Sequence, residues 1–254
     1  MSIGRVLNTA FGAIFGNLFV MLGIAFLFSG LPQGLVTYFQ QSVQARMVGG
    51  QVAPGTLLGV FVVGILVFVL FGVIAQGALV RATMTASQGG KASFGECLTV
   101  GLGRMLPLIG LSLVSGLAFV VAALLLIVPA IILATVWYVA APLVVIERSG
   151  VFAALGRSAD LTRGERWNIF VVLLIMLGFL LVSFMLSSVV SGIGIAISAR
   201  SGDFSGLASL SAIAAAINTT VQTTLTGAIT SSVYIELRGL KEGPESQGLD
   251  AVFA

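Results

Sequence analysis

Apolar residues fill long stretches of this chain without interruption by a charged side chain. Five such stretches contain between 32 and 42 residues each. About 20 predominantly apolar residues are enough for a helix to cross a hydrocarbon core about 30 Å thick. The pattern therefore predicts a polytopic helical membrane protein. The charge-free stretches are 6–45, 47–80, 105–146, 167–199 and 204–235.

The stretch 105–146 is too long for one crossing, because a single helix of that length would extend about 63 Å. Val128-Pro129 predicts the break, since proline lacks the amide hydrogen of a helix interior but suits a first helical turn. The predicted fold class is all-α, with six transmembrane helices forming three hairpins in one domain, 1–238. A polar tail, 239–254, is expected to be disordered. The predicted spans are 14–38, 56–80, 105–127, 130–147, 167–198 and 207–236.

A short segment with helical spacing precedes the first, third and fifth predicted spans. The segments read IGRVLNTAFGAIFGN from residue 3, FGECLTVGLGRM from residue 94 and FAALGRSADLTRGERW from residue 152. We expect three short cytoplasmic interfacial helices, each followed by a hairpin, as three copies of one unit. Chance similarity within an apolar sequence of low diversity is the alternative.

The third of these segments predicts an amphipathic helix over 150–163. Phe152, Leu155 and Ala159 share one face of it. Gly164 follows where a left-handed residue commonly ends a helix, so it is the expected terminator.

Composition agrees with a membrane protein and adds an orientation. Charged residues make up 8% of the chain and the mean hydropathy is +1.14, whereas about a quarter of a soluble domain is charged. With six spans, ten of the 12 Lys and Arg residues lie on the side of both termini, opposite Arg46 and Arg200. The positive-inside rule then places both termini in the cytoplasm. The basic residues are too scattered to form a nucleic-acid-binding patch, so no nucleic-acid partner is expected.

Seven of the 21 charged residues lie within 140–167. This loop has two interpretations. Its arginines can bind anionic lipid headgroups, at roughly 1 kcal/mol for each basic residue near the membrane surface. Alternatively they set the topology and pair locally, with Asp160 three residues from either Arg157 or Arg163. The candidate headgroup-binding or loop-organising residues are Glu147, Arg148, Arg157, Asp160, Arg163, Arg166 and Trp167.

The sixth predicted span is unusually polar. A stripe of hydroxyl and amide side chains on one helix face can line a solute path, or it can hydrogen-bond neighbouring helices. Gly12-x-x-x-Gly16 and Gly55-x-x-x-Gly59 have the spacing of close helix contacts, which fits the second interpretation. The stripe consists of Thr219, Gln222, Thr223, Thr226 and Thr230.

The succession VPAIILATVWYVAAPLVVIE from residue 128, GVFAALGRSADLTRGERW from residue 150 and a long apolar span resembles the glycerophosphoryl diester phosphodiesterase membrane-domain family of bacteria. The resemblance implies a six-span protein of the bacterial cytoplasmic (inner) membrane. Some members are fused to a catalytic domain, but this chain lacks histidine and has no room for a barrel of about 250 residues. The positions that match the family pattern are Pro129, Pro142, Glu147, Ala154, Leu155, Arg157, Ser158, Leu161, Thr162, Gly164 and Trp167.

No catalytic constellation is recognisable in the sequence. A rhomboid-type protease requires histidine, and Asp160 and Asp203 are predicted on opposite sides of the membrane, so they cannot form an aspartyl dyad. With a single cysteine, Cys97, we expect no metal site and no cofactor. The predicted function is a non-catalytic scaffold or lipid- or partner-interacting membrane module, whose partners are lipids, another membrane protein or a second copy. A transporter or channel for a small uncharged solute is the alternative.

Overall fold

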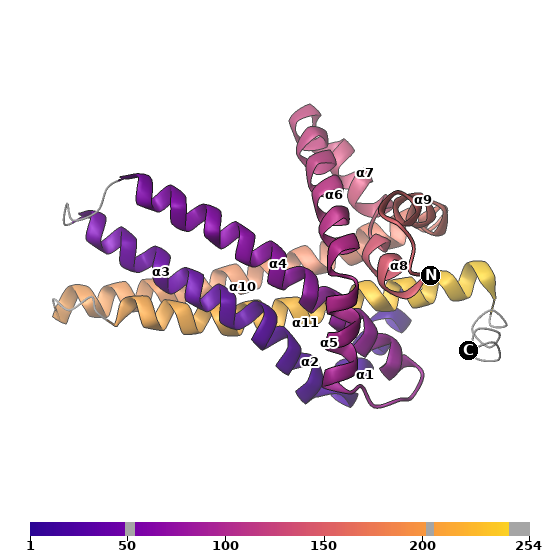
Figure 1. Ribbon diagram of the computed structural model, residues 1–254, viewed down its shortest axis with the longest axis horizontal. Coiled ribbons are helices and arrows are strands. Elements are labelled where there is room, and N and C mark those ends of the chain that lie inside the picture. Colours follow the sequence, from indigo (N-terminus) through magenta and orange to yellow (C-terminus); the bar gives the residue numbers. More distant parts are fainter. Residues whose placement is uncertain (49–53, 202–205, 244–254) are drawn as a thin grey trace.

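The computed structural model describes residues 1–48, 54–201 and 206–243, and every regular element in these ranges is a helix (Figure 1). This confirms the all-α class. The elements are α1 Ile3–Gly16, α2 Leu18–Ala25, the π-helix η1 Phe26–Gly30, α3 Leu31–Val48, α4 Pro54–Ser87, α5 Phe94–Gly103, α6 Met105–Leu125, α7 Ile127–Val136, α8 Ala140–Ile146, α9 Val151–Thr162, α10 Arg166–Ser201 and α11 Leu207–Glu242.

Five helical segments in the described ranges are long and apolar enough to cross a membrane, which identifies a multi-pass membrane protein. α11 is as long as α10, at 36 residues, but is not among the five. Its many serine, threonine, asparagine and glutamine residues lower its hydropathy. The five segments are Leu18–Gln44, Leu58–Ser87, Met105–Leu125, Ile127–Ile146 and Arg166–Ile197.

Several predicted boundaries are wrong. The first long helix begins at Leu18 and not at residue 14, because Asn17 leaves the helical conformation between α1 and α2. The break after α6 lies at Leu126, whose backbone is extended, and Pro129 instead occupies the first turn of α7. The predicted span 130–147 is also interrupted, since 137–139 separate α7 from α8.

The last helix is longer than predicted. α11 continues to Glu242 and therefore includes residues 239–242, which the sequence assigned to the tail. Residues 244–254 of that tail, like Asp203, lie outside the described residues.

Short helices occur at all three predicted places. α1, α5 and α9 precede the hairpins α2–α4, α6–α7 and α10–α11. Gly164 has a φ of 88° after α9, as expected of a left-handed terminator. The predicted apolar face of α9 is right for Leu155, which is buried, and wrong for Phe152, which is 77% exposed; the helix buries Ala154 and Leu161 beside Leu155.

The buried core lies where the short helices meet the adjoining ends of α4 and α11. From this region, which we call the head, the α3–α4 and α10–α11 hairpins extend in one direction and the α6–α7 hairpin diverges from them (Figure 1). The hairpins expose most of their apolar side chains; Leu124, near the tip of α6, is 82% exposed. Core residues of the head include Val6, Met21, Leu79, Cys97, Leu108, Leu143, Leu155, Ile169, Val233, Tyr234 and Leu237.

The end of η1 and the start of α3 approach α11 closely through small residues. A β-carbon added to Gly30 would lie 2.6 Å from the Ala216 carbonyl oxygen, and one added to Gly34 would lie 2.9 Å from that of Ala212. Gly12, Gly16, Gly55 and Gly59 have open space at the corresponding position, so the glycine pairs named from spacing do not make such contacts.

The π-helix η1 ends at Gly30, within this contact. Its last turn is widened, with the Leu31 amide donating to the Phe26 carbonyl five residues back. Pro32 follows directly; it has no amide to donate and its ring crowds the carbonyl four residues earlier. A wider turn relieves that crowding.

Candidate functional site

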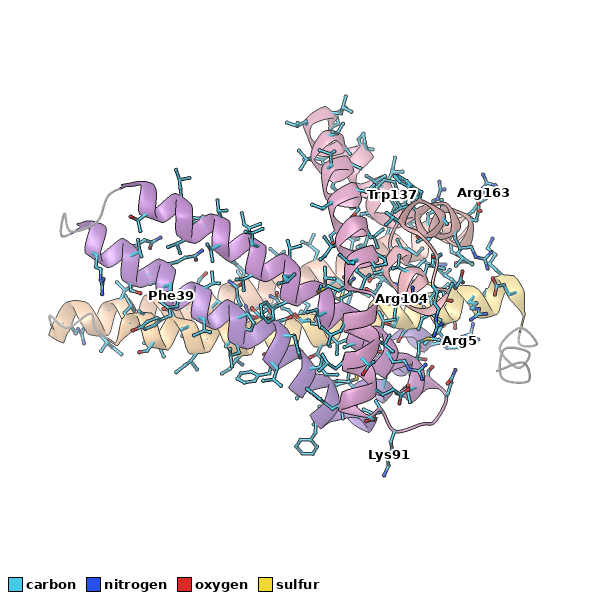
Figure 2. All side chains as sticks on the ribbon, viewed as in Figure 1. Arg5, Phe39, Lys91, Arg104, Trp137 and Arg163 are labelled. Carbon is cyan, nitrogen blue, oxygen red and sulfur yellow. The ribbon has the colours of Figure 1, made fainter. Side chains whose placement is uncertain are left out.

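Ion pairs that involve both terminal segments lie at the head end of the molecule. The Met1 ammonium lies 2.9 Å from Glu165, and Arg5 lies 2.7 Å from Glu236. Hydrogen bonds from the Met1 ammonium and from Asn168 lower the pKa of Glu165. Figure 2 shows Arg5, Arg104 and Arg163 at this end, while Phe39 lies along the α3 arm.

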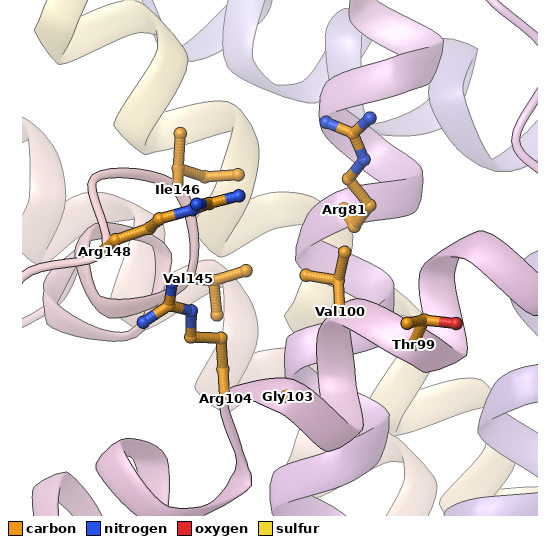
Figure 3. Close-up of a pocket in the computed structure, with 8 residues that line it drawn as sticks. All are labelled: Arg81, Thr99, Val100, Gly103, Arg104, Val145, Ile146 and Arg148. Carbon is orange, nitrogen blue, oxygen red and sulfur yellow. The ribbon is translucent and has the colours of Figure 1, made fainter.

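A cavity of about 450 Å³ opens in this part of the head, between α4, α5 and α8. Arg81, Arg104 and Arg148 line it, together with Thr99 and the apolar Val100, Val145 and Ile146. Figure 3 shows the side chains of Arg104 and Arg148 on the same side of the pocket, with Arg81 across from them. We call this the arginine cavity.

The three arginines differ in how they are neutralised. Arg81 forms an ion pair with Glu96 at 2.5 Å. Arg104 and Arg148 form no ion pair with any residue that the structure describes. The cavity therefore holds more positive charge than its own carboxylates balance.

Arg148 has an unusual backbone. Its φ is 53°, and it is the one non-glycine residue with positive φ in the described ranges. This left-handed region costs most L-residues about 1–3 kcal/mol. The conformation turns the chain between α8 and α9 and brings the Arg148 side chain to the cavity.

The structure separates the cluster of charged residues that the sequence suggested. Glu147 lies 3.5 Å from Arg157 and accepts a hydrogen bond from the Tyr234 hydroxyl at 3.0 Å. Arg157 also pairs with Glu242, and Arg238 lies 2.9 Å from the same carboxylate. Arg157 is therefore a link between α9, α8 and α11 and lies outside the lining of the arginine cavity.

The remaining predicted residues of the loop lie on the surface. Asp160, Arg163 and Arg166 are exposed and have no ion-pair partner within the described ranges. Trp167 stacks at a tilt on Phe170, with ring centroids 5.4 Å apart. Among the seven predicted residues only Arg148 lines the arginine cavity.

Sequence reasoning missed Arg81, Thr99 and Arg104 as site residues. Arg81 and Arg104 contributed only to the orientation. The sequence feature that could have identified Arg104 is its position between a short helix and a span, because a side chain at such a junction faces the head. The neighbouring Cys97 is buried in α5, and burial is the main cause that raises the pKa of its thiol.

A second cavity, of about 530 Å³, lies between η1, α3, α4, α6 and α11. Four of the five predicted stripe residues line it, and Thr230 does not. We call it the polar cavity. Its polar lining residues are Ser29, Gln33, Gln76, Ser112, Thr219, Gln222, Thr223 and Thr226.

The threonines of α11 form two stripes with different roles. Thr220 and Thr224 face away from the cavity and donate to backbone carbonyls four residues back, at 2.7 and 2.8 Å. Among the described residues, Thr219, Thr223 and Thr226 have no side-chain hydrogen bond. The predicted stripe therefore lines a cavity, whereas Thr220 and Thr224, which were not part of it, bond to the backbone of α11.

No protein-family model, curated protein or solved structure matches this chain. The family resemblance stays a prediction, and the two cavities are interpreted from their own residues.

Proposed function

We propose that this protein is a non-catalytic, lipid-binding module of the bacterial cytoplasmic membrane that holds an anionic phospholipid headgroup in the arginine cavity. One observation carries the proposal. Arg104 and Arg148 both line a concave site without a carboxylate partner among the described residues.

The chemistry of the cavity suits a phosphate diester. Guanidinium groups bind phosphate oxygens through paired, charge-assisted hydrogen bonds. A phosphate would supply the negative charge that the cavity lacks, and Val100, Val145 and Ile146 offer apolar surface to the adjoining glycerol and chains. The volume of about 450 Å³ is ample for a phosphoglycerol headgroup.

The proposal includes an orientation in which α11 is the sixth span and both termini are cytoplasmic. Its support is the distribution of basic residues along the molecule. Arg46 and Arg200 lie in the last turns of α3 and α10, at the ends of the hairpins away from the head. The head contains the arginine cavity and the ion pairs of both terminal segments.

The test compares two variants of equal charge. Arg104→Gln/Arg148→Gln empties the cavity of its unpaired arginines, and Arg163→Gln/Arg166→Gln removes two exposed arginines of the same end. Native mass spectrometry of protein extracted from phosphatidylglycerol-containing membranes would count the lipids retained. We expect the first variant to lose retained phosphatidylglycerol at least about tenfold, since each charge-assisted contact is worth about 1.5–3 kcal/mol, and the second to resemble the wild type. Equal retention in all three proteins, or equal loss in both variants, would overturn the proposal.

A further inference from the structure

We propose that the polar cavity is a second ligand site, which binds an uncharged group rich in hydroxyls, either a free polyol or sugar or the sugar headgroup of a glycolipid. It is independent of the arginine cavity and of the phosphate chemistry proposed there, because the two cavities share no lining residue.

The lining selects against charge. All of its polar side chains are neutral hydroxyls or amides, contributed by five different helical segments. An ion in this cavity would lose hydration without gaining an opposite charge, which is costly in an apolar surrounding. Glutamine amides and serine or threonine hydroxyls both donate and accept hydrogen bonds, as the hydroxyls of a polyol do.

Several of these groups are left without a partner inside the protein. Ser29 is only 8% exposed, and its hydroxyl has no hydrogen-bond partner in the part of the chain that the structure describes. Thr219 and Thr223 line the same cavity from α11 and do not return their hydroxyls to the backbone as Thr220 and Thr224 do. A buried polar group without a partner costs about 1–3 kcal/mol, and a ligand hydroxyl would recover that energy.

The polar cavity lies beside an irregular turn of the backbone and is open to its surroundings. Ser29 belongs to the π-helix η1, and single turns of this kind are frequent at functional sites. Thr226 and Phe68 line the cavity and are exposed, so it opens to the surroundings of the hairpins. Gln222 and Thr226 also line a smaller, mainly apolar cavity of about 310 Å³ between Tyr138, α10 and α11, which could receive part of an acyl chain.

Binding would be measured on the purified full chain in detergent with two probes, myo-inositol and a monoglucosyl diacylglycerol. Isothermal titration calorimetry and the shift in thermal midpoint provide the readouts. Saturable binding of inositol identifies a soluble ligand, whereas binding of the glycolipid alone identifies a headgroup; either result supports the inference. Saturation by neither probe overturns it.

Two adjacent, isosteric substitutions locate the site. Thr223→Val removes a hydroxyl that lines the cavity, and Thr224→Val removes one that bonds to its own backbone and does not line the cavity. The double variant Gln222→Leu/Thr223→Val should weaken binding by about tenfold or more, as expected for the loss of two hydrogen bonds. Thr223→Val alone should also weaken binding, whereas Thr224→Val should change it less than about twofold. Equal effects of the two threonine variants would contradict the site.

A second variant from another helix protects the test from a folding defect in α11. Gln76→Leu alters the same cavity from α4. It should weaken binding of the probe that saturates while phosphatidylglycerol retention stays unchanged. Normal binding by Gln76→Leu would exclude this cavity as the site, whatever the outcome for the arginine cavity.

Discussion

At the scale of single residues, Arg148 has a backbone conformation that lowers stability and a side chain that lines the proposed binding site. A left-handed conformation suits glycine, which has no β-carbon to crowd the carbonyl. Arg148 adopts it with a φ of 53° beside two further arginines. Strain of this kind is commonly retained where the side chain is needed for function.

Arg148→Gly should therefore raise the thermal stability of the protein while lowering its retention of anionic lipid. We expect a gain of about 1 kcal/mol in the free energy of unfolding, because backbone strain and repulsion between arginines are both relieved. Thermal unfolding in detergent and native mass spectrometry would measure the two effects on the same sample. A clear loss of stability would show that the arginine side chain stabilises the head by itself.

Cys97 gives a second prediction at this scale. The thiol is buried and its pKa is raised, first by burial and then by the nearby Glu96 carboxylate, so little thiolate exists at neutral pH. Because the thiolate is the reactive form, maleimide should label the folded protein far more slowly than the protein unfolded in dodecyl sulfate. Mass spectrometry of both samples after equal times checks this, and similar labelling would contradict burial of α5 against the head.

At the scale of helices, η1 makes a tight contact with α11 at Gly30. A methyl group there would meet the Ala216 carbonyl oxygen at 2.6 Å and the Thr220 hydroxyl even closer. Neither neighbour is a flexible side-chain end, since one is backbone and the other is held by its own hydrogen bond to that backbone.

Gly30→Ala should thus destabilise the protein by about 1–3 kcal/mol, the usual cost of overpacking. Gly59→Ala is the matched control, because it adds the same methyl group to α4 with nothing within 4 Å. Both can be compared by thermal unfolding in detergent. A midpoint for Gly30→Ala at or above that of the control would show that η1 and α11 are not held at this distance.

The helices also show which features a sequence can reveal. Charge-free stretches located the long helices because a charged group in a span is costly, and Gly164 was recognised because a left-handed terminator has a local cause. The interruption at 137–139 has a cause that is distant in the sequence. The hydroxyls of Ser158 and Thr162 in α9 donate to the carbonyl oxygen of Val136, at 2.8 and 3.3 Å. Contacts across 22 and 26 residues leave no periodic trace in the chain.

The same limit applies to the sites. Four threonine and glutamine residues of the polar cavity were predicted because they lie on one helix and share its period. Arg81 and Arg104 were not grouped with Arg148, because only the packing of α4, α5 and α8 brings these distant positions together. The local pattern thus grouped residues of one helix face, and tertiary packing makes that face the wall of a cavity.

At the scale of the whole molecule, a buried head carries hairpins with exposed apolar surfaces. In each apolar span segment, only 17% to 39% of an 18-residue apolar stretch is buried within the chain, so lipid or other proteins must cover the remainder. α11 differs from the other long helices in being polar, and it packs between α3, α4 and α10. A helix shielded by neighbours can cross a membrane at a lower apolar content, because its polar groups meet protein instead of hydrocarbon.

The labelling of introduced cysteines can therefore decide whether α11 is the sixth span. The native Cys97 is buried and should contribute little labelling of its own. Gln44, Gly156 and Leu240 are exposed positions in α3, α9 and α11. With an impermeant maleimide, Gln44→Cys should be labelled in intact spheroplasts, and Gly156→Cys and Leu240→Cys only in inverted vesicles. Labelling of Leu240→Cys from the opposite side to Gly156→Cys would mean that α10 crosses and α11 does not return. Labelling of Gly156→Cys in spheroplasts would invert the orientation and remove the arginine cavity from the anionic cytoplasmic leaflet.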